Sequence, residues 1–218
     1  TLLTKSNLFP MSKNHPSLLQ KLQSYWRSFR KLPAPEKKWV LRHPFSAMRI
    51  PAIKNLVEQI IRQKYQRNEW DASYSDGQLD ALRHALWMAL TARQIGVEKA
   101  RSLGKAHEAG NKIMAQKKQK EHGSLADKAS TDMDLRNNEV GLRMAQENPD
   151  ASVEQLVTSI ENQIKEGRLW IIKQDARGRY LSWEGHKLNE KDYRGKWLSP
   201  RCIVPSNYNL DEKPNEHL

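Results

Sequence analysis

The sequence is poor in cysteine and has no long apolar run, which removes several protein classes at once. Cys202 is the single cysteine among 218 residues, so an internal disulfide and a cysteine-based zinc cluster are both excluded. No stretch of about 18 apolar residues occurs, which predicts that the chain has no transmembrane helix. No secretory signal is visible, and a first residue of Thr1 rather than Met is consistent with a processed product or a fragment.

Negative charge is also scarce relative to positive charge. The chain has 37 Lys and Arg against 25 Asp and Glu, which gives a formal net charge of +12. This excess either serves solubility alone or favours an anionic substrate or surface, such as lipid, a cell-wall polymer or nucleic acid. The aromatic residues are scattered rather than interleaved with basic ones, which disfavours binding to single-stranded nucleic acid.

Hydrophobic periodicity predicts a mainly α fold, with five to six helices, a short C-terminal β-hairpin and an irregular tail. We expect three parts along the chain: a basic N-terminal arm with one amphipathic helix over 1–45, a helical core domain ending in a β-hairpin over 46–185, and an irregular C-terminal tail over 186–218.

The N-terminal arm combines a helix with a proline-rich stretch. Residues 17–31 carry apolar side chains at helical spacing, with Lys and Arg on the other face. Such a basic helix either lies on a membrane surface or packs on its own domain. Pro33, Pro35 and Pro44 then indicate a linker that wraps the core.

The core carries helical patterns separated by recognisable stops. Helices are predicted over residues 51–66, 76–95, 97–119, 124–147 and 152–166. Ser75 with Gln78, and Ser152 with Gln155, have the spacing of capping boxes. The lysine-rich end of the third predicted core helix indicates a solvated connection. After Gly167 the period becomes that of strands, and residues 168–183 predict a β-hairpin with a glycine turn.

Polar side chains interrupt the apolar pattern of the helix predicted over 76–95. Asp80 and His84 are four residues apart and therefore lie one turn apart on one face. The Asp can fix the tautomer of the imidazole, both can bind a metal, or the two form only a surface ion pair. Arg83 can bind a phosphate or carboxylate, and Trp87 continues the face of Asp80 and His84.

The next predicted helix contains His107 directly followed by Glu108. Asn111 stands where the zinc motif HExxH would have its second His, so that motif is absent. Taken alone, the pair is explained more simply by a solvated helix face. As functional residues, His107 would act as acid, base or metal ligand, and Glu108 as its partner.

The helix predicted over 124–147 contains Asp134, Asn137 and Asn138 on its polar side. Two adjacent Asn residues are poor helix formers, which suggests that their amides are used for hydrogen bonds. They either orient a substrate or water, or lock neighbouring helices together. Gly141 suggests that another backbone approaches closely.

Taken together, these segments predict one polar site inside a helical core, because buried polar groups need partners. The predicted catalytic residues are His84, Asp80, His107 and Glu108, and the predicted substrate-binding residues are Arg83, Trp87, Asp134, Asn137 and Asn138. Two chemistries stay open: a metal-free acid–base site, or a divalent metal bound by nitrogen and oxygen ligands.

The ordered motifs, RHAxW at Arg83–Trp87, AHE at 106–108 and DxxNNxxG at Asp134–Gly141, resemble a small all-helical bacterial domain. That domain occurs in secreted proteins and as a module of polymorphic toxins. The resemblance covers about a quarter of the chain. It implies a bacterial origin, a shared site, a secreted or envelope location with the cytoplasm as alternative, and an immunity or envelope protein as partner.

A looser likeness is to the helical prokaryotic phospholipases A2, although Ala85 stands here where their calcium-binding Asp would follow His84. Charge and motifs together predict a secreted or envelope-directed hydrolase, in the manner of a toxin effector. Its substrate would be an anionic ester, namely a phospholipid, a lipid-linked phosphate or a phosphodiester. The alternative is a non-enzymatic basic protein that binds the envelope or nucleic acid, in which the polar core is structural.

Overall fold

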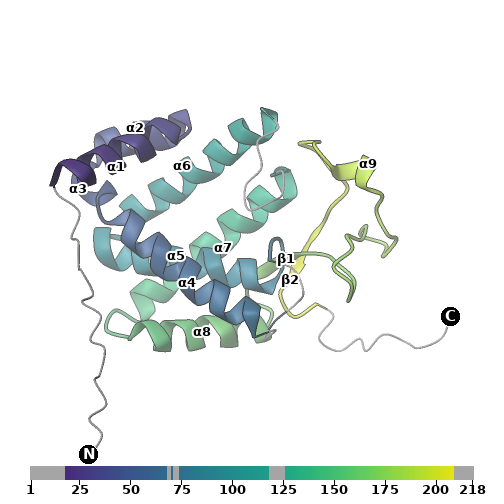
Figure 1. Ribbon diagram of the computed structural model, residues 1–218. Coiled ribbons are helices and arrows are strands. Elements are labelled where there is room, and N and C mark those ends of the chain that lie inside the picture. The colour runs from purple at the N-terminus through teal and green to yellow at the C-terminus, as the bar shows by residue number, and fades with distance from the viewer. Residues whose placement is uncertain (1–17, 68–69, 71–73, 118–125, 209–218) are drawn as a thin grey trace, which may run out of the picture. The chain divides into compact units, whose positions relative to one another are not determined.

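The computed structural model of the protein describes residues 18–67, 70, 74–117 and 126–208. The chain forms two compact units, which divide between Leu32 and Pro33. The first unit contributes the helix α1, and the second contains every other helix and strand that the structure describes (Figure 1).

Helix α1 (Leu18–Lys31) corresponds to the amphipathic helix predicted over 17–31. Its last turn is basic, and its sequence contains no acidic residue. Trp26 stacks on Phe29 with ring centroids 5.7 Å apart, while Leu19 and Trp26 are exposed. The helix therefore presents large apolar groups together with positive charge.

The second unit is a helical bundle followed by two short strands. Its elements in chain order are α2 (Ala34–Arg42), α3 (Pro44–Ala47), α4 (Ile50–Gln66), α5 (Gln78–Ile95), α6 (Val97–Gln116), α7 (Lys128–Glu147), α8 (Val153–Lys165), β1 (Trp170–Ile172), α9 (Glu190–Tyr193) and β2 (Ile203–Pro205). This arrangement confirms the predicted class, which is mainly helical with a short antiparallel pair of strands near the C-terminus.

Helix α5 lies at the centre of this bundle and packs against α4, α6, α7, α8 and β1 (Figure 1). Fourteen of its 18 residues are buried, including polar ones. Leu79, Leu82 and Leu86 join the main core, together with Ile61 of α4 and Ile160 of α8. A helix enclosed on all sides cannot direct its polar side chains to water, so they must meet partners inside the protein.

Two predicted helix starts have different outcomes. Ser152 and Gln155 form the expected capping box of α8, because each side chain bonds the backbone N–H of the other residue. The predicted box at Ser75 and Gln78 is wrong, since α5 begins after Gly77 without a side-chain cap.

The proline-rich stretch is helical, and its interpretation as a linker is wrong. Pro35 lies in the first turn of α2, and Pro44 begins α3. The first turn of a helix has no use for the N–H that proline lacks, so proline is favoured there.

The strands pair differently from the predicted hairpin. β1 pairs antiparallel with β2, with Trp170 opposite Pro205 and Ile172 opposite Ile203. The segment expected to return as the second strand makes isolated bridges instead, between Gln174 and Tyr180 and between Leu181 and Lys187. The C-terminal segment supplies the partner strand instead, because Val204 buries its side chain in the main core.

The predicted solvated connection falls mostly on residues 118–125, which lie outside the described residues. Among the helices that the structure describes, none combines the length and the apolar character needed to cross a membrane.

Candidate active site

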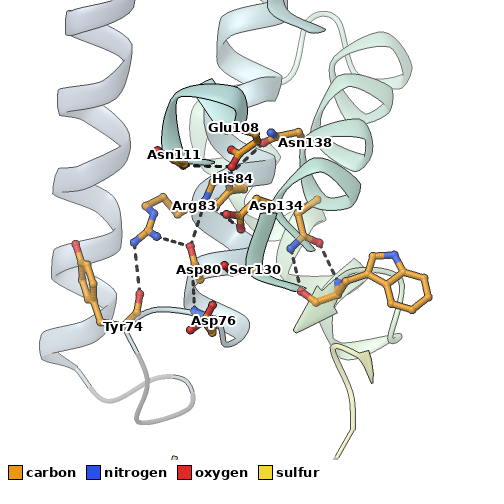
Figure 2. Close-up of polar contacts among 12 residues, drawn as sticks. Tyr74, Asp76, Asp80, Arg83, His84, Glu108, Asn111, Ser130, Asp134 and Asn138 are labelled. Atoms are coloured by element: carbon orange, nitrogen blue, oxygen red, sulfur yellow. Dashed lines mark hydrogen bonds and ion pairs between the residues drawn. The ribbon is translucent and has the colours of Figure 1, made fainter. Parts of the chain in front are cut away.

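Helix α5 places Asp80 and His84 one turn apart in the interior of the bundle (Figure 2). Nε2 of His84 lies 3.4 Å from Oδ1 of Asp80, which confirms the contact predicted from their spacing. Their exposed fractions are only 7% and 4%, so the two do not form a surface ion pair.

Helix α7 brings Asp134 and Asn138 against the same imidazole. Oδ1 of Asp134 lies 3.3 Å from Nε2 of His84, and Oδ1 of Asn138 lies 3.3 Å from Nδ1. Both nitrogens of the ring therefore face oxygen atoms, with one carboxylate from each of two helices near Nε2. The prediction that separate helices contribute to one site holds for these residues.

The close packing of α5 and α7 depends on Gly141. A Cβ atom at this position would lie 2.1 Å from the carbonyl oxygen of Ala85, which is far inside any allowed contact. The predicted close approach of another backbone is therefore confirmed. Because Gly141 carries no side chain, the two helices come near enough for Asp134 and Asn138 to reach His84.

Asp80 is held in place by two donors. Arg83 donates to Oδ1 of Asp80, and the backbone N–H of Asp76 donates to Oδ2 over 2.6 Å (Figure 2). Burial alone would lower the pKa of Arg83, but the nearby carboxylates of Asp80 and Asp134 raise it, so the guanidinium stays charged. Arg83 therefore orients Asp80, and its contact with a substrate stays a prediction.

Helix α6 adds Glu108, which is 2% exposed and accepts a hydrogen bond of 3.2 Å from Nδ2 of Asn111. Figure 2 shows Glu108 beside Asn138 and His84. Burial raises the pKa of Asp134 well above its usual range, and the carboxylates of Glu108 and Asp80 raise it further. We call Asp80, His84, Glu108, Asp134 and Asn138 the His84 cluster.

His107 takes a different direction from its neighbour Glu108. Its Nδ1 lies 3.0 Å from Oε1 of Glu36 on α2, and its ring meets the edge of Trp87 at 5.1 Å between centroids. Successive helical residues point about 100° apart, which separates His107 from Glu108. The catalytic role predicted for His107 and the substrate contact predicted for Trp87 stay predictions.

Asn137 is buried but serves the strand β1. Its Nδ2 donates to the carbonyl oxygen of Trp170, and its Oδ1 accepts from the N–H of Trp170, both at 2.9 Å. The amide thus bonds the backbone as a neighbouring strand would. This outcome matches the structural explanation of the two Asn residues for Asn137, whereas Asn138 contacts His84.

A second buried polar cluster was missed by sequence reasoning. Arg201 lies 2.9 Å from Oδ2 of Asp76 and 2.6 Å from Oδ1 of Asp127. Tyr180 donates to Asp76, and Ser199 donates to Asp127. We call these five residues the Arg201 cluster. Its members lie up to 125 positions apart along the chain, and local sequence patterns do not predict contacts between such distant residues.

Asp80, His84 and Asp134 also meet a simple requirement for binding a metal ion. Each offers one ligand atom, these atoms lie within 4.8 Å of one another, and all three residues are buried. Carboxylate oxygen and imidazole nitrogen are ordinary ligands of divalent metals. The predicted choice between a metal centre and a metal-free site thus concerns these three residues.

Comparison with known proteins gives one match. Residues 37–168 match the family described as "Domain of unknown function (DUF6973)", and the chain belongs to this family. The matched region contains the whole His84 cluster, whereas Tyr180, Ser199 and Arg201 lie beyond it. No curated protein and no solved structure shows significant similarity to the chain.

Proposed function

We propose that this member of the DUF6973 family is a hydrolase of anionic esters, with the His84 cluster as its reaction centre. The observation that carries the proposal is an imidazole whose Nε2 lies 3.4 and 3.3 Å from two carboxylates, in the interior of a helical bundle. Groups of this kind are costly to bury, and their concentration in one place is typical of reaction centres.

The proposed reaction is the attack of water on the ester. The water oxygen forms a bond to the acyl carbon or to phosphorus, the bond to the alcohol oxygen breaks, and the proton lost by water moves to that oxygen. His84 can serve this reaction by taking the proton, or by binding a cation that makes water more acidic. In the first route Asp80 holds the imidazole, and in the second it binds the cation together with His84.

The other members of the cluster have supporting roles in the proposal. Asp134 and Asn138 orient water or substrate beside the imidazole, which each contacts. Glu108 takes the role of the second acid or base because it lies with Asp134 in the interior. Arg83 neutralises part of the negative charge through its bond to Asp80.

The positive charge of the chain supports an anionic substrate, such as a phospholipid, a lipid-linked phosphate or a phosphodiester. Helix α1 supports a lipid surface in particular, since it combines basic residues with the exposed side chains of Leu19 and Trp26. The resemblance to domains of bacterial secreted proteins and toxins extends the proposal to an envelope-directed effector.

The test replaces His84 by Ala and compares cleavage of anionic phospholipid vesicles and of nucleic acid. We expect cleavage to fall by a factor of about 100 to 10,000, which is the usual contribution of an acid–base group. His186→Ala is the matched control, because His186 is an exposed histidine far from α5 in the sequence. Circular dichroism establishes that both variants are folded. Full activity in a folded His84→Ala protein contradicts the proposal.

The same experiment also tests a second candidate function, that of a non-enzymatic protein that binds anionic surfaces. The basic and apolar character of α1 is the observation that favours it. It predicts binding to anionic vesicles that weakens with salt, is equal in wild type and His84→Ala, and is accompanied by no cleavage in either protein.

A further inference from the structure

We propose that Asp80, His84 and Asp134 bind one divalent transition-metal ion, of the Mn²⁺ or Zn²⁺ kind. The binding itself stands on the geometry of these three residues, whereas the role of the ion in activating water rests on the proposed function. Three properties of the site lead to this inference, namely its distances, the tautomer of His84 and its charge.

The two distances from the imidazole nitrogen to the carboxylates agree with atoms that share one ion, and all three ligand atoms lie within 4.8 Å of one another. Bonds from such an ion to nitrogen or oxygen measure about 2.1 Å, which puts neighbouring ligand atoms about 3.0 to 3.4 Å apart in octahedral or tetrahedral geometry. Nε2 of His84 lies 3.4 Å from Oδ1 of Asp80 and 3.3 Å from Oδ1 of Asp134. These separations are longer than good hydrogen bonds and match the edges of a coordination shell.

The partner of Nδ1 directs the other ring nitrogen toward the ion. Oδ1 of Asn138 lies 3.3 Å from Nδ1 of His84, so this amide oxygen can accept the proton of Nδ1. The lone pair of a neutral imidazole is then on Nε2, where it faces the two carboxylates. Ligating histidines are commonly held in this way by an acceptor behind the ring. A cation between the three atoms replaces repulsion by attraction.

The charge of the cluster also favours a cation. The carboxylates of Asp80, Glu108 and Asp134 lie near enough to one another to raise the pKa of Asp134, which burial raises as well. Oδ1 of Asp134, in a residue that is only 9% exposed, has no hydrogen-bond partner among the residues described. One divalent ion would offset the repulsion among these carboxylates and give this oxygen a partner.

The ligand set selects the kind of ion. Two carboxylates with one imidazole suit Mn²⁺, Fe²⁺ or Zn²⁺, whereas Mg²⁺ and Ca²⁺ prefer oxygen alone. Thiolate plays no part, because Cys202 lies in the C-terminal segment and contacts the carbonyl oxygen of Leu181.

The experiment uses the full chain after removal of metals with a chelator. Mn²⁺ is added and the free ion is followed by its electron paramagnetic resonance signal, and Zn²⁺ is titrated by calorimetry. We expect one ion per chain, and an affinity at least about tenfold weaker in Asp134→Asn. Asp132→Asn is the matched control, because Asp132 lies on the same helix and pairs with Lys128 at the surface. Its affinity should equal that of the wild type.

A second measurement needs no variant and covers the case in which Asp134→Asn does not fold. Coupling of bound Mn²⁺ to one imidazole nitrogen, detected by pulsed resonance, is expected in the wild type. No bound ion, an ion without nitrogen coupling, or equal affinity in folded Asp134→Asn overturns the inference.

Failure of this inference is distinguishable from failure of the proposed function. A chain that binds the ion with imidazole coupling but cleaves no ester supports the metal site and contradicts the hydrolase. A metal-free chain that cleaves esters at the full rate contradicts the role of the ion in activating water and leaves the hydrolase in place, whereas the titrations alone decide whether the site binds an ion.

Discussion

The two buried polar clusters differ in how well their charges are matched. In the Arg201 cluster, one guanidinium bonds two carboxylates, and hydroxyl groups complete the contacts of those carboxylates. Burial alone would raise the pKa of Asp127, but the hydrogen bonds and charge of Arg201 lower it. In the His84 cluster the pKa of Asp134 is raised instead, by burial and by neighbouring carboxylates.

This difference separates a structural lock from a candidate reaction centre. A buried network whose members are satisfied holds segments together, and Arg201 joins the C-terminal segment to the helical bundle in this way. A buried network in which carboxylates lie close to one another, as around Asp134, is costly to form and is more typical of a functional site. The comparison therefore supports a stabilising role for the first cluster and the proposed chemical role for the second.

The largest effect on stability is expected from replacing Arg201 by Met. The change leaves Asp76 and Asp127 as buried carboxylates without their guanidinium, which should lower the free energy of unfolding by about 3–5 kcal/mol. Urea denaturation followed by circular dichroism measures it. Arg194→Ala is the control, since Arg194 pairs with Glu190 at the surface and should contribute about 0–1 kcal/mol. An equal loss of unfolding free energy in both variants would contradict the stabilising role of the Arg201 cluster.

A pair of Asp→Asn variants sharpens the comparison through the sign of its effects. Asp127→Asn should lower the free energy of unfolding by about 1–3 kcal/mol, because it weakens charged hydrogen bonds to Arg201. Asp134→Asn in metal-free buffer should raise it by about 0.5–2 kcal/mol, because it removes a buried charge beside two other carboxylates. The measurement is the urea midpoint of unfolding of the wild type and the two variants, in the presence of a chelator. Destabilisation by both variants would mean that both clusters are structural.

The smallest effect is the pH dependence that Asp127 confers. Its pKa is lower in the folded protein than in the unfolded chain, so the unfolded chain binds the proton more readily. The stabilisation is complete above the usual pKa of Asp, about 4, and is lost as the pH falls through the lower folded value. The stability difference between wild type and Asp127→Asn should therefore shrink as the pH falls below about 4. A constant difference down to about pH 2 would contradict this assignment.

Local patterns predicted much of the bundle. Apolar spacing identified α1 and the long helices from α4 to α8, because it reports which side of each helix is buried. The spacing of Asp80 and His84 predicted their contact, and the two Asn residues with Gly141 indicated that α7 meets another helix closely. Such sequence patterns predict contacts between residues one helical turn apart, or the close approach of a second helix at one position.

Contacts between distant segments were beyond such patterns. The pairing of β1 with β2 and the bonds of Arg201 depend on where the C-terminal segment returns, which no local spacing encodes. The direction of His107 toward Glu36 required the position of α2, in a stretch where the prolines suggested a linker. The division of the polar residues between two clusters therefore needed the structure.

Asp76 has a backbone φ of +67°, and it is the residue that connects the two clusters. Its N–H donates to Asp80 while its carboxylate receives Arg201. The family match ends at residue 168, but contacts that support the helical bundle come from residues as far along the chain as Arg201. A protein shortened to the matched region would keep every proposed metal ligand but lose Arg201. Without Arg201, the carboxylate of Asp76 would have no guanidinium partner, although the N–H of Asp76 holds the ligand Asp80.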